Sequence, residues 1–468
     1  GALPLAGGTM TGNIVLGTNT VGGLQITTSA TSNIGLGATA VDSITTGDNN
    51  IGIGYIAGTA ITTGDNNNLI GVNTGRLITT GSSNTGIGHG ALYKVTTQSD
   101  NVAVGRSALS NTVSANNTAV GKSALQENTS GSDSVAVGYR ALYLNTTGSL
   151  NVAIGKEALY ANTTAEAGVA IGEFALTANT TGARNVAIGS STLRVQTTAA
   201  DNTAIGYQAN RYNTSGASNT SIGSRALNAN TTGAQNTAVG TSALDANTTG
   251  SYNIAAGYEA LTSNTTASNN TAFGYRAMKE TTTGASNVAT GYWALHDNTT
   301  GTNNAAFGYE ALKSNTTASS NVAVGIFSLK ANTTGASGTA VGANALAANT
   351  DANYNSAFGA DSLQTNTTGA SNTGIGQGAL NANTTASNNT AVGRSSLNVN
   401  TTGASNTAVG YTALLANTTG AWNTAVGTNA LDANTTGSRN VAIGENALTA
   451  NTTAGSNTAV GDTSLQAN

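Results

Sequence analysis

A period of 17 residues runs through almost all of this 468-residue chain and limits the folds that it can adopt. If the aliphatic residue of the strings NTAVG and NVAIG is taken as an anchor position, 26 anchors follow one another from Leu36 to Val460, among them Val426 and Ile443. One repeat, which ends at Val120, has 16 residues instead of 17. A disordered chain would not keep an aliphatic residue in phase over so many repeats, so the pattern predicts an ordered stack of similar units.

Four other positions of the repeat are nearly constant and give the consensus N-[TV]-A-[VI]-G-x-x-A-L-x-A-N-T-T-G-x-x. Glycine follows the anchor in every repeat, which predicts a corner with unusual backbone dihedrals or a close approach between backbones. Asparagine stands three residues before and eight residues after the anchor, and leucine five residues after it. Two successive repeats place these residues at Asn423 and Asn440, Gly427 and Gly444, Leu431 and Leu448, and Asn434 and Asn451.

The side chains of N-V-A-I-G alternate as in a short β-strand, with Val441 and Ile443 on one face and Ala442 on the other. A 17-residue unit is too short for two packed helices. It suits one coil of two or three short strands that hydrogen-bonds the next coil about 4.8 Å away. We therefore predict an all-β fold, a β-solenoid (parallel β-roll or β-helix) of about 26 coils over residues 33–468. Residues 1–32 form a separate N-terminal segment that only imitates a coil.

The expected core of each coil is small. Its two large side chains would be the anchor and the conserved leucine, for example Val426 and Leu431, with alanines such as Ala425 filling the remaining space. Their burial is modest against the conformational entropy of 17 ordered residues, so further burial through association of chains is expected.

Four successive anchors alternate between small and large side chains: Ala256, Phe273, Thr290 and Phe307. In a packed interior, a phenyl ring that overfills its own layer borrows room from smaller neighbours. The alternation therefore predicts that these four positions touch one another inside the solenoid.

The two asparagine columns admit two interpretations. If the coils are stacked, the amide of Asn434 or Asn423 could bond the equivalent amide one coil away, so that donor and acceptor are satisfied together. Alternatively, these residues stand at turns, where asparagine tolerates left-handed backbone. We expect the ladder, more so in the Asn434 column.

A stripe of aromatic residues occupies the second position after the anchor. Tyrosine fills this position in four successive repeats, and a tryptophan follows one of them: Tyr258, Tyr275, Tyr292, Tyr309 and Trp293. Rings spaced by one coil could stack on the faces of sugars and bind a surface glycan. They could equally stack on one another and only cover the wall of the solenoid.

Composition and spacing argue against catalysis and against bound cofactors or metals. Charged residues make up 8% of the chain and the net charge is -4, which disfavours nucleic acid as a partner. There is no cysteine, and His89 and His296 are the only histidines, so no His/Cys zinc cluster can form. Acidic residues are scattered without the clusters that glycoside hydrolysis or calcium binding need. No apolar run approaches the roughly 18 residues of a membrane span, so we expect no membrane insertion.

The strings NVAIG at 151–155, 185–189 and 440–444 resemble the head repeats of trimeric autotransporter adhesins. That resemblance implies left-handed β-rolls joined about a threefold axis, and hence a homotrimer. The adhesin repeat is usually a few residues shorter.

The N-terminal string LPLAGGTMTGNIVLG, residues 3–17, resembles a motif that recurs in phage tail-fibre proteins. It implies a homotrimeric fibre that is extracellular, belongs to the virion and contacts other tail components. Host-surface glycan or protein would be bound through a tip outside this chain. We therefore expect a non-catalytic tail-fibre shaft.

Two other functions stay open. One is a trimeric adhesin head that itself binds glycan or matrix. The other is an ice-binding solenoid, because Thr435 and Thr436 and their equivalents form two threonine columns. Adjacent residues of a strand face opposite ways, which disfavours the flat threonine face that ice binding requires.

Overall fold

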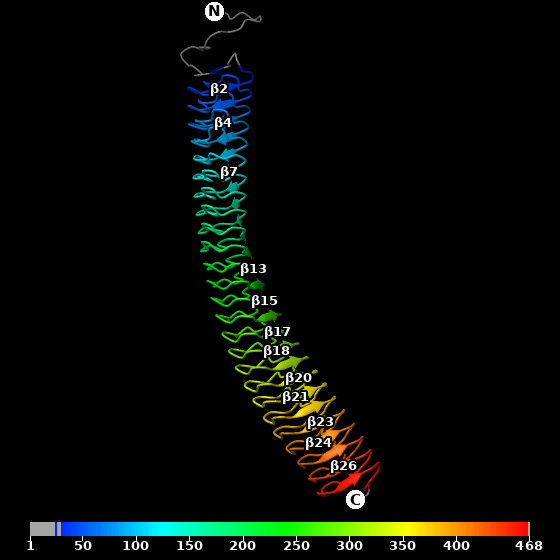
Figure 1. Ribbon diagram of the computed structural model, residues 1–468. Helices are drawn as coiled ribbons and strands as arrows, with labels where there is room; N and C mark the ends of the chain where they lie inside the picture. The colour runs from blue at the N-terminus through cyan, green and yellow to red at the C-terminus, as the bar shows by residue number, and fades with distance from the viewer. Residues whose placement is uncertain (1–23, 26–29, 467–468) are drawn as a thin grey trace, which may run out of the picture. The chain divides into compact units, whose positions relative to one another are not determined.

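The computed structural model describes residues 24–25 and 30–466, which divide into two compact units at Ser218 and Asn219. Each unit is a β-solenoid, as the repeat predicts. Within the described residues there is no helix, and so none that could cross a membrane. The stacked coils of both units are seen in Figure 1.

The first unit contains twelve strands, of which all but β1 have three residues. They are β1 (Leu24–Gln25), β2 (Ile34–Leu36), β3 (Ile51–Ile53), β4 (Asn68–Ile70), β5 (Thr85–Ile87), β6 (Val102–Val104), β7 (Thr118–Val120), β8 (Val135–Val137), β9 (Val152–Ile154), β10 (Val169–Ile171), β11 (Val186–Ile188) and β12 (Thr203–Ile205).

The second unit contains fifteen strands of three residues. They are β13 (Thr220–Ile222), β14 (Thr237–Val239), β15 (Ile254–Ala256), β16 (Thr271–Phe273), β17 (Val288–Thr290), β18 (Ala305–Phe307), β19 (Val322–Val324), β20 (Thr339–Val341), β21 (Ser356–Phe358), β22 (Thr373–Ile375), β23 (Thr390–Val392), β24 (Thr407–Val409), β25 (Thr424–Val426), β26 (Val441–Ile443) and β27 (Thr458–Val460).

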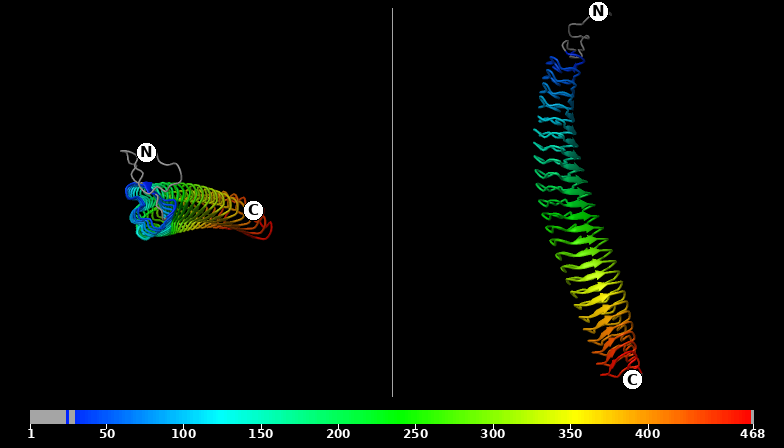
Figure 2. Two further views of the ribbon diagram at one scale, coloured as in Figure 1. Left: turned by 90° about the horizontal axis from the view of Figure 1, so that it is seen from above. Right: turned by 45° about the vertical axis from the view of Figure 1, so that its right-hand side comes forward.

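From β2 onward, consecutive strands within each unit pair in parallel and in register. Ala425 lies beside Ala442, for example, and Val426 beside Ile443. The strands of the second unit form one column along one side of its coils (Figure 2). The 16-residue repeat does not disturb this register, because Val104 still pairs with Val120. At the start of the first unit, β1 pairs with β2 in the antiparallel direction.

Each coil contains one strand, so the expectation of two or three strands per coil is wrong. The rest of the coil turns through residues with left-handed backbone that are not glycine, such as Asn429 (φ 53°), Leu431 (φ 55°) and Arg439 (φ 61°). A bulky residue rarely adopts this conformation. Coil-to-coil hydrogen bonds hold it here: the N–H of Leu431 donates to the carbonyl of Ala447 at 2.9 Å.

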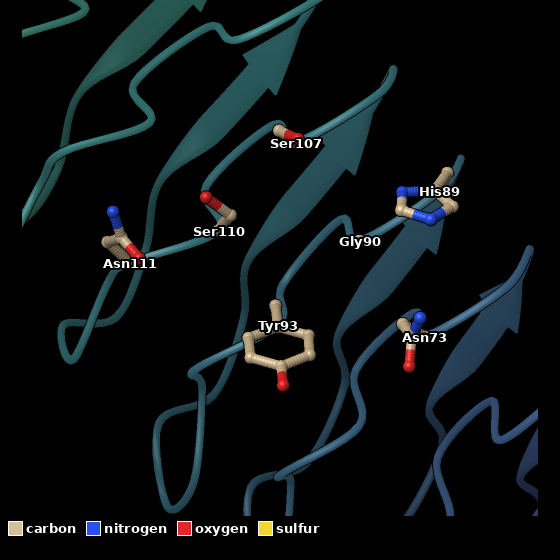
Figure 3. A pocket seen from close by; sticks show the side chains of 7 residues that line it. All are labelled: Asn73, His89, Gly90, Tyr93, Ser107, Ser110 and Asn111. Atoms are coloured by element: carbon tan, nitrogen blue, oxygen red, sulfur yellow. The ribbon is translucent and has the colours of Figure 1, made fainter.

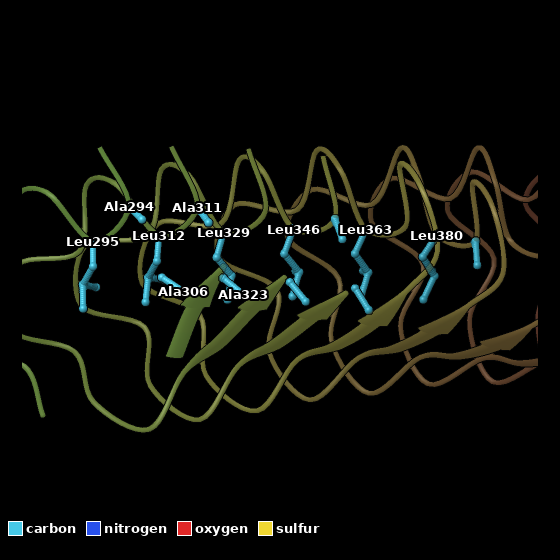
Figure 4. Close-up of a cluster of buried hydrophobic side chains, with 14 of the residues drawn as sticks. Ala294, Leu295, Ala306, Ala311, Leu312, Ala323, Leu329, Leu346, Leu363 and Leu380 are labelled. Atoms are coloured by element: carbon cyan, nitrogen blue, oxygen red, sulfur yellow. The ribbon is translucent and has the colours of Figure 1, made fainter. Parts of the chain in front are cut away.

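The core consists of alanine and leucine, not of anchor residues. Ala442 in the strand, and Ala447 and Leu448 after it, are fully buried, and this pattern repeats through both units. Figure 4 shows part of this column of alanines and leucines in the second unit. The prediction that Val426 is a core residue is wrong, because its side chain is 36% exposed, and that of Ile443 is 40% exposed. Leu431 is buried as predicted.

The space behind the strand explains why the large side chains point outward. Gly86 holds the alanine position of β5, and a Cβ added there would lie 2.6 Å from Cγ2 of Thr74. At Gly374 in β22 an added Cβ would lie 2.6 Å from Oγ of Ser362. In most coils the interior therefore accepts a methyl group at most, and alternation along the strand turns the valine or isoleucine on either side outward. In β4 the buried Leu69 holds this position, because Gly75 beside it has no Cβ and leaves room for the longer side chain.

The anchors that alternate between small and large side chains also point outward instead of into the core. Strand pairing places Ala256 beside Phe273, Phe273 beside Thr290, and Thr290 beside Phe307, so the four positions are neighbours as predicted. They lie on the outer face instead of inside the solenoid, since Phe273 is 43% exposed and Phe307 is 41% exposed.

The glycine after the anchor is required by a close approach between coils. Gly155 has φ +132°, and a Cβ added there would lie 2.6 Å from both the carbonyl carbon and the carbonyl oxygen of Gly172. We expect Gly155→Ala to destabilise the neighbouring coils by about 3 kcal/mol or more, through strain and backbone displacement. Hydrogen exchange of the amides in coils on either side would report the loss locally.

Gly90→Ala is the matched control, because Gly90 also has positive φ (+67°) but an added Cβ would meet nothing within 4 Å. Only the cost of left-handed backbone, about 1 to 2 kcal/mol, is expected there. Equal destabilisation by the two substitutions would contradict the close-approach explanation.

Candidate functional site

The asparagine column eight residues after the anchor is a ladder of side-chain amides. The Nδ2 of Asn434 donates to Oδ1 of Asn417 at 2.8 Å, and the Nδ2 of Asn451 donates to Oδ1 of Asn434 at 3.1 Å. The second proton of Asn434 Nδ2 goes to the carbonyl of Gly437 at 3.0 Å. Asn434 is fully buried and its φ is not positive, so the turn interpretation does not apply.

The column three residues before the anchor binds mainly backbone. The N–H of Asn423 donates to Oδ1 of Asn406 at 2.9 Å, and the N–H of Asn440 donates to Oδ1 of Asn423 at 3.0 Å. The Nδ2 of Asn423 donates to the carbonyl of Gly437 at 2.9 Å. Both columns thus satisfy most buried amides while linking each coil to the next. The Oδ1 of Asn179 and that of Asn264 have no partner within the described part of the chain, because Gln196 and Thr281 replace asparagine in the next coil.

Two adjacent asparagines, one buried in the column and one exposed, allow the contribution of the column to stability to be measured. Asn304 is 1% exposed, whereas Asn303 is exposed. The Nδ2 of Asn304 donates to the carbonyl of Ala318 at 2.8 Å, and its Oδ1 accepts from the N–H of Asn321 at 3.0 Å. We expect Asn304→Ala to cost about 2 to 3 kcal/mol of local stability, because backbone and amide groups of the adjoining coils lose buried partners. Local hydrogen exchange would measure this cost.

Asn303→Ala should cost about 1 kcal/mol at most, since Ala167 occupies the equivalent position with φ 53° in another coil. If both substitutions had the same small effect, the ladder would not be a main source of stability.

The outer surface of the strands, which we call the anchor face, consists of the anchor side chains and the first residue of each strand. In the second unit the large anchor side chains with exposures of 36–66% are Ile222, Val239, Phe273, Phe307, Val324, Phe358, Ile375, Val409, Val426, Ile443 and Val460. In the first unit Ile70, Ile87 and Ile154 are 38–40% exposed. The anchor face is therefore a mainly apolar surface that is partly exposed along both units, and more so in the second, with Thr290 as a polar anchor.

The predicted aromatic stripe is a stack of rings. Centroids of Tyr258, Tyr275, Tyr292 and Tyr309 lie 5.1 to 5.3 Å apart in sequence order, with interplanar angles of 6–12°. Trp293 stacks on Tyr292 at 5.3 Å. Both faces of Tyr275 and Tyr292 are therefore covered by protein rings, so a sugar could reach only the edges of these rings.

Charged groups line this aromatic stack. The carboxylate of Glu259 lies 2.8 Å from Nε of Arg276 and 3.4 Å from Nζ of Lys279. Burial opposes ionisation of Glu259, but hydrogen bonds from Tyr258 and Arg276 and the charge of Lys279 outweigh it, so its pKa is lowered. The hydrogen bond to Glu259, followed by the charge of that carboxylate, raises the pKa of Tyr258.

Sequence reasoning missed the cationic and aromatic partners around Trp293. The Nζ of Lys313 lies 4.3 Å from the centre of the Trp293 ring, and the His296 ring lies 4.9 Å from it. Lys313 and His296 both stand six residues after an anchor. Their shared position in the repeat was the available signal, but it was not used.

The two threonine columns differ in exposure. Thr435 is partly buried, and its hydroxyl donates to the carbonyl of Thr452 at 3.0 Å. Thr436 is exposed. One hydroxyl column is thus engaged in coil-to-coil bonding, and only the other is open to solvent.

Among the described residues, no group of three or more His, Cys, Asp and Glu side chains could hold a metal ion. Most ion pairs there join neighbouring coils at the surface, as between Lys156 and Glu173 at 3.1 Å. The tail-fibre-like string at 3–17 lies outside the described residues.

No protein-family model matches the chain, and no curated protein sequence matches it.

Proposed function

We propose that this chain is the shaft of a phage tail fibre, a non-catalytic structural element built from three identical chains in parallel. The observation that carries the proposal is the anchor face. A periodic apolar surface exposed along a solenoid is costly in water and is typical of an interaction surface.

The periodicity of the anchor face favours a second copy of the same chain as its partner. Its aliphatic side chains recur once per coil, about 4.8 Å apart. A partner that covers such a face continuously needs the same spacing, and another copy in the same register has it. The face also carries Thr and Val in place of charged residues, so its burial incurs no charge-desolvation penalty.

An in-register partner favours closed cyclic symmetry. Identical chains that meet through the same surface close into a ring only when equivalent residues lie at equal height along the axis. Three anchor faces around one axis would form a second, shared core in addition to the alanine–leucine core of each chain. Alternating small and large anchors, such as Ala256 and Phe273, would let phenyl rings in one layer extend into the roomier layers beside it.

The string LPLAGGTMTG supports placement in a virion, with the shaft joined to other tail components. Host-surface glycan or protein would be bound by a tip outside this chain. The second candidate is a trimeric adhesin head, which the NVAIG strings favour; the two proposals share the same trimeric architecture. Ice binding is less supported, because the Thr435 hydroxyl is engaged by the next coil.

Light scattering with multi-angle detection tests the association. The expected solution mass is three times the 45.9 kDa of one chain. Replacing Val409, Val426 and Ile443 together with Glu should give the mass of a single chain, because three carboxylates per layer would be buried against one another.

The matched control replaces Thr402, Thr419 and Thr436 with Glu, which adds the same charge at exposed positions of the same coils. This control should keep the trimeric mass. A single-chain mass for the unmodified protein would overturn the proposal. A trimer that tolerates the three glutamates on the anchor face would place the interface elsewhere.

The absence of cysteine allows a direct test of register. A single Ile443→Cys substitution should form an intermolecular disulfide readily under mild oxidation, since equivalent anchors would meet near the axis. Thr436→Cys should not. Non-reducing electrophoresis would distinguish them, and equal cross-linking of both variants would contradict an in-register interface through the anchor face.

A further inference from the structure

A second surface column lies six residues after each anchor and carries rings that stack between coils. In the first unit it includes Tyr143 and Tyr160, whose centroids are 5.4 Å apart with an interplanar angle of 7°. A tyrosine in this column therefore presents the face of its ring to the next coil, where a second ring covers it.

Tyr93 occupies the same column, but its two neighbours in that column are not aromatic. Arg76 in the preceding coil lies over the ring, with its guanidinium carbon 5.8 Å from the centroid and Nη1 3.2 Å from the Tyr93 hydroxyl. In the following coil the column carries Ser110, which is too small to cover a ring. Beside Tyr93, Gly90 contributes no side chain, and an added Cβ there would meet nothing within 4 Å.

The two small residues together leave a hollow of about 220 Å³ on the surface of the first unit. Three successive coils line it, as Figure 3 shows. Its lining consists of Asn73, His89, Gly90, Tyr93, Ser107, Ser110 and Asn111.

The polar atoms of this hollow suit hydroxyl groups. The Oδ1 of Asn73 is buried and has no hydrogen-bond partner among the described residues. The Nδ2 of Asn111 donates to Glu127 at 2.8 Å, which directs its donor away and leaves Oδ1 as an acceptor. Ser107 and Ser110 add hydroxyls that can donate or accept.

We propose that this hollow binds one neutral pyranose ring. The apolar face of the sugar stacks on the open face of Tyr93, at the height where the column elsewhere holds a second tyrosine. Its hydroxyls donate to Oδ1 of Asn111 and exchange hydrogen bonds with Ser107 and Ser110. A rotation of the Asn73 side chain would bring its unpaired Oδ1 within reach of a further hydroxyl. Aromatic rings with planar amides and hydroxyls around them match the mixed apolar and polar surface of a sugar.

The size and charge of the hollow narrow the ligand further. Its volume lies below the roughly 300 to 1,000 Å³ of sites that hold drug-sized molecules, so it takes a single ring. Arg76 lies behind Tyr93 and already engages its hydroxyl, and the lining holds no other arginine or lysine, so a neutral sugar fits better than an anionic one. His89 is the lining residue that can become cationic. The site is complete within one chain and does not depend on the proposed trimer.

Ligand-observed saturation-transfer NMR on the full chain tests the proposal. The probes are methyl α-D-glucopyranoside, methyl β-D-galactopyranoside and phenol at millimolar concentration. At least one glycoside should bind. Its affinity should fall about tenfold or more in Tyr93→Ser, which removes the stacking surface.

Gly90→Arg is the second variant, and it fills the hollow with a residue that the position three residues after the anchor accepts in another coil. Arg140 holds the equivalent position and lies over Tyr143, with its guanidinium carbon 5.5 Å from the ring centre. Gly90→Arg should therefore place a guanidinium over Tyr93 and abolish glycoside binding. Gly378 also stands three residues after its anchor, but it lies outside the hollow. Gly378→Arg therefore makes the same change elsewhere and should leave glycoside binding unchanged.

Three results would overturn the proposal: no binding of either glycoside, binding that Gly90→Arg leaves intact, or binding of phenol alone. The solution mass of each variant shows that the fold and its association are unaltered. A failed sugar test with an unchanged trimeric mass would leave the proposed shaft function in place.

Discussion

The interaction on which this structure depends is the in-register hydrogen bonding of each coil to the next. Because equivalent residues recur at every 17 residues, any side chain repeated in the sequence becomes a column in space. Buried amides can then bond their own equivalents, as Asn434 does with Asn417. Glycine after the anchor is needed for the same reason, since backbones at Gly155 and Gly172 approach too closely for a Cβ.

The thin interior has a direct consequence for the outer surface. In most coils only a methyl group fits behind the strand, so Ala442 is buried and the larger Val441 and Ile443 are directed outward. The chain thereby presents an apolar face that its own coil cannot cover. A single physical limit, the room behind the strand, thus connects the alanine core of each chain with the proposed association of three chains.

Columns also explain how a repetitive chain acquires individual sites. A column of one residue type forms a continuous feature, such as the stack from Tyr258 to Tyr309. A site arises where the residue type changes in two neighbouring columns at the same place along the stack. Gly90 and Ser110 are such changes beside Tyr93, and a hollow is left there. The rings of the longer stack cover one another. The sequence pattern therefore predicted more access of a sugar to these ring faces than the structure allows.

The sequence by itself determined the period, the β-solenoid, the two asparagine columns, the glycine corner and the burial of Leu431, because each follows from strict repetition and stacking. Only the tertiary structure decided which strand face points inward. Alternation shows that Val441 and Ile443 share a face, but it does not say which face is buried. That choice depends on how tightly the coil closes, which the left-handed residues Asn429, Leu431 and Arg439 set through backbone geometry that residue type does not reveal.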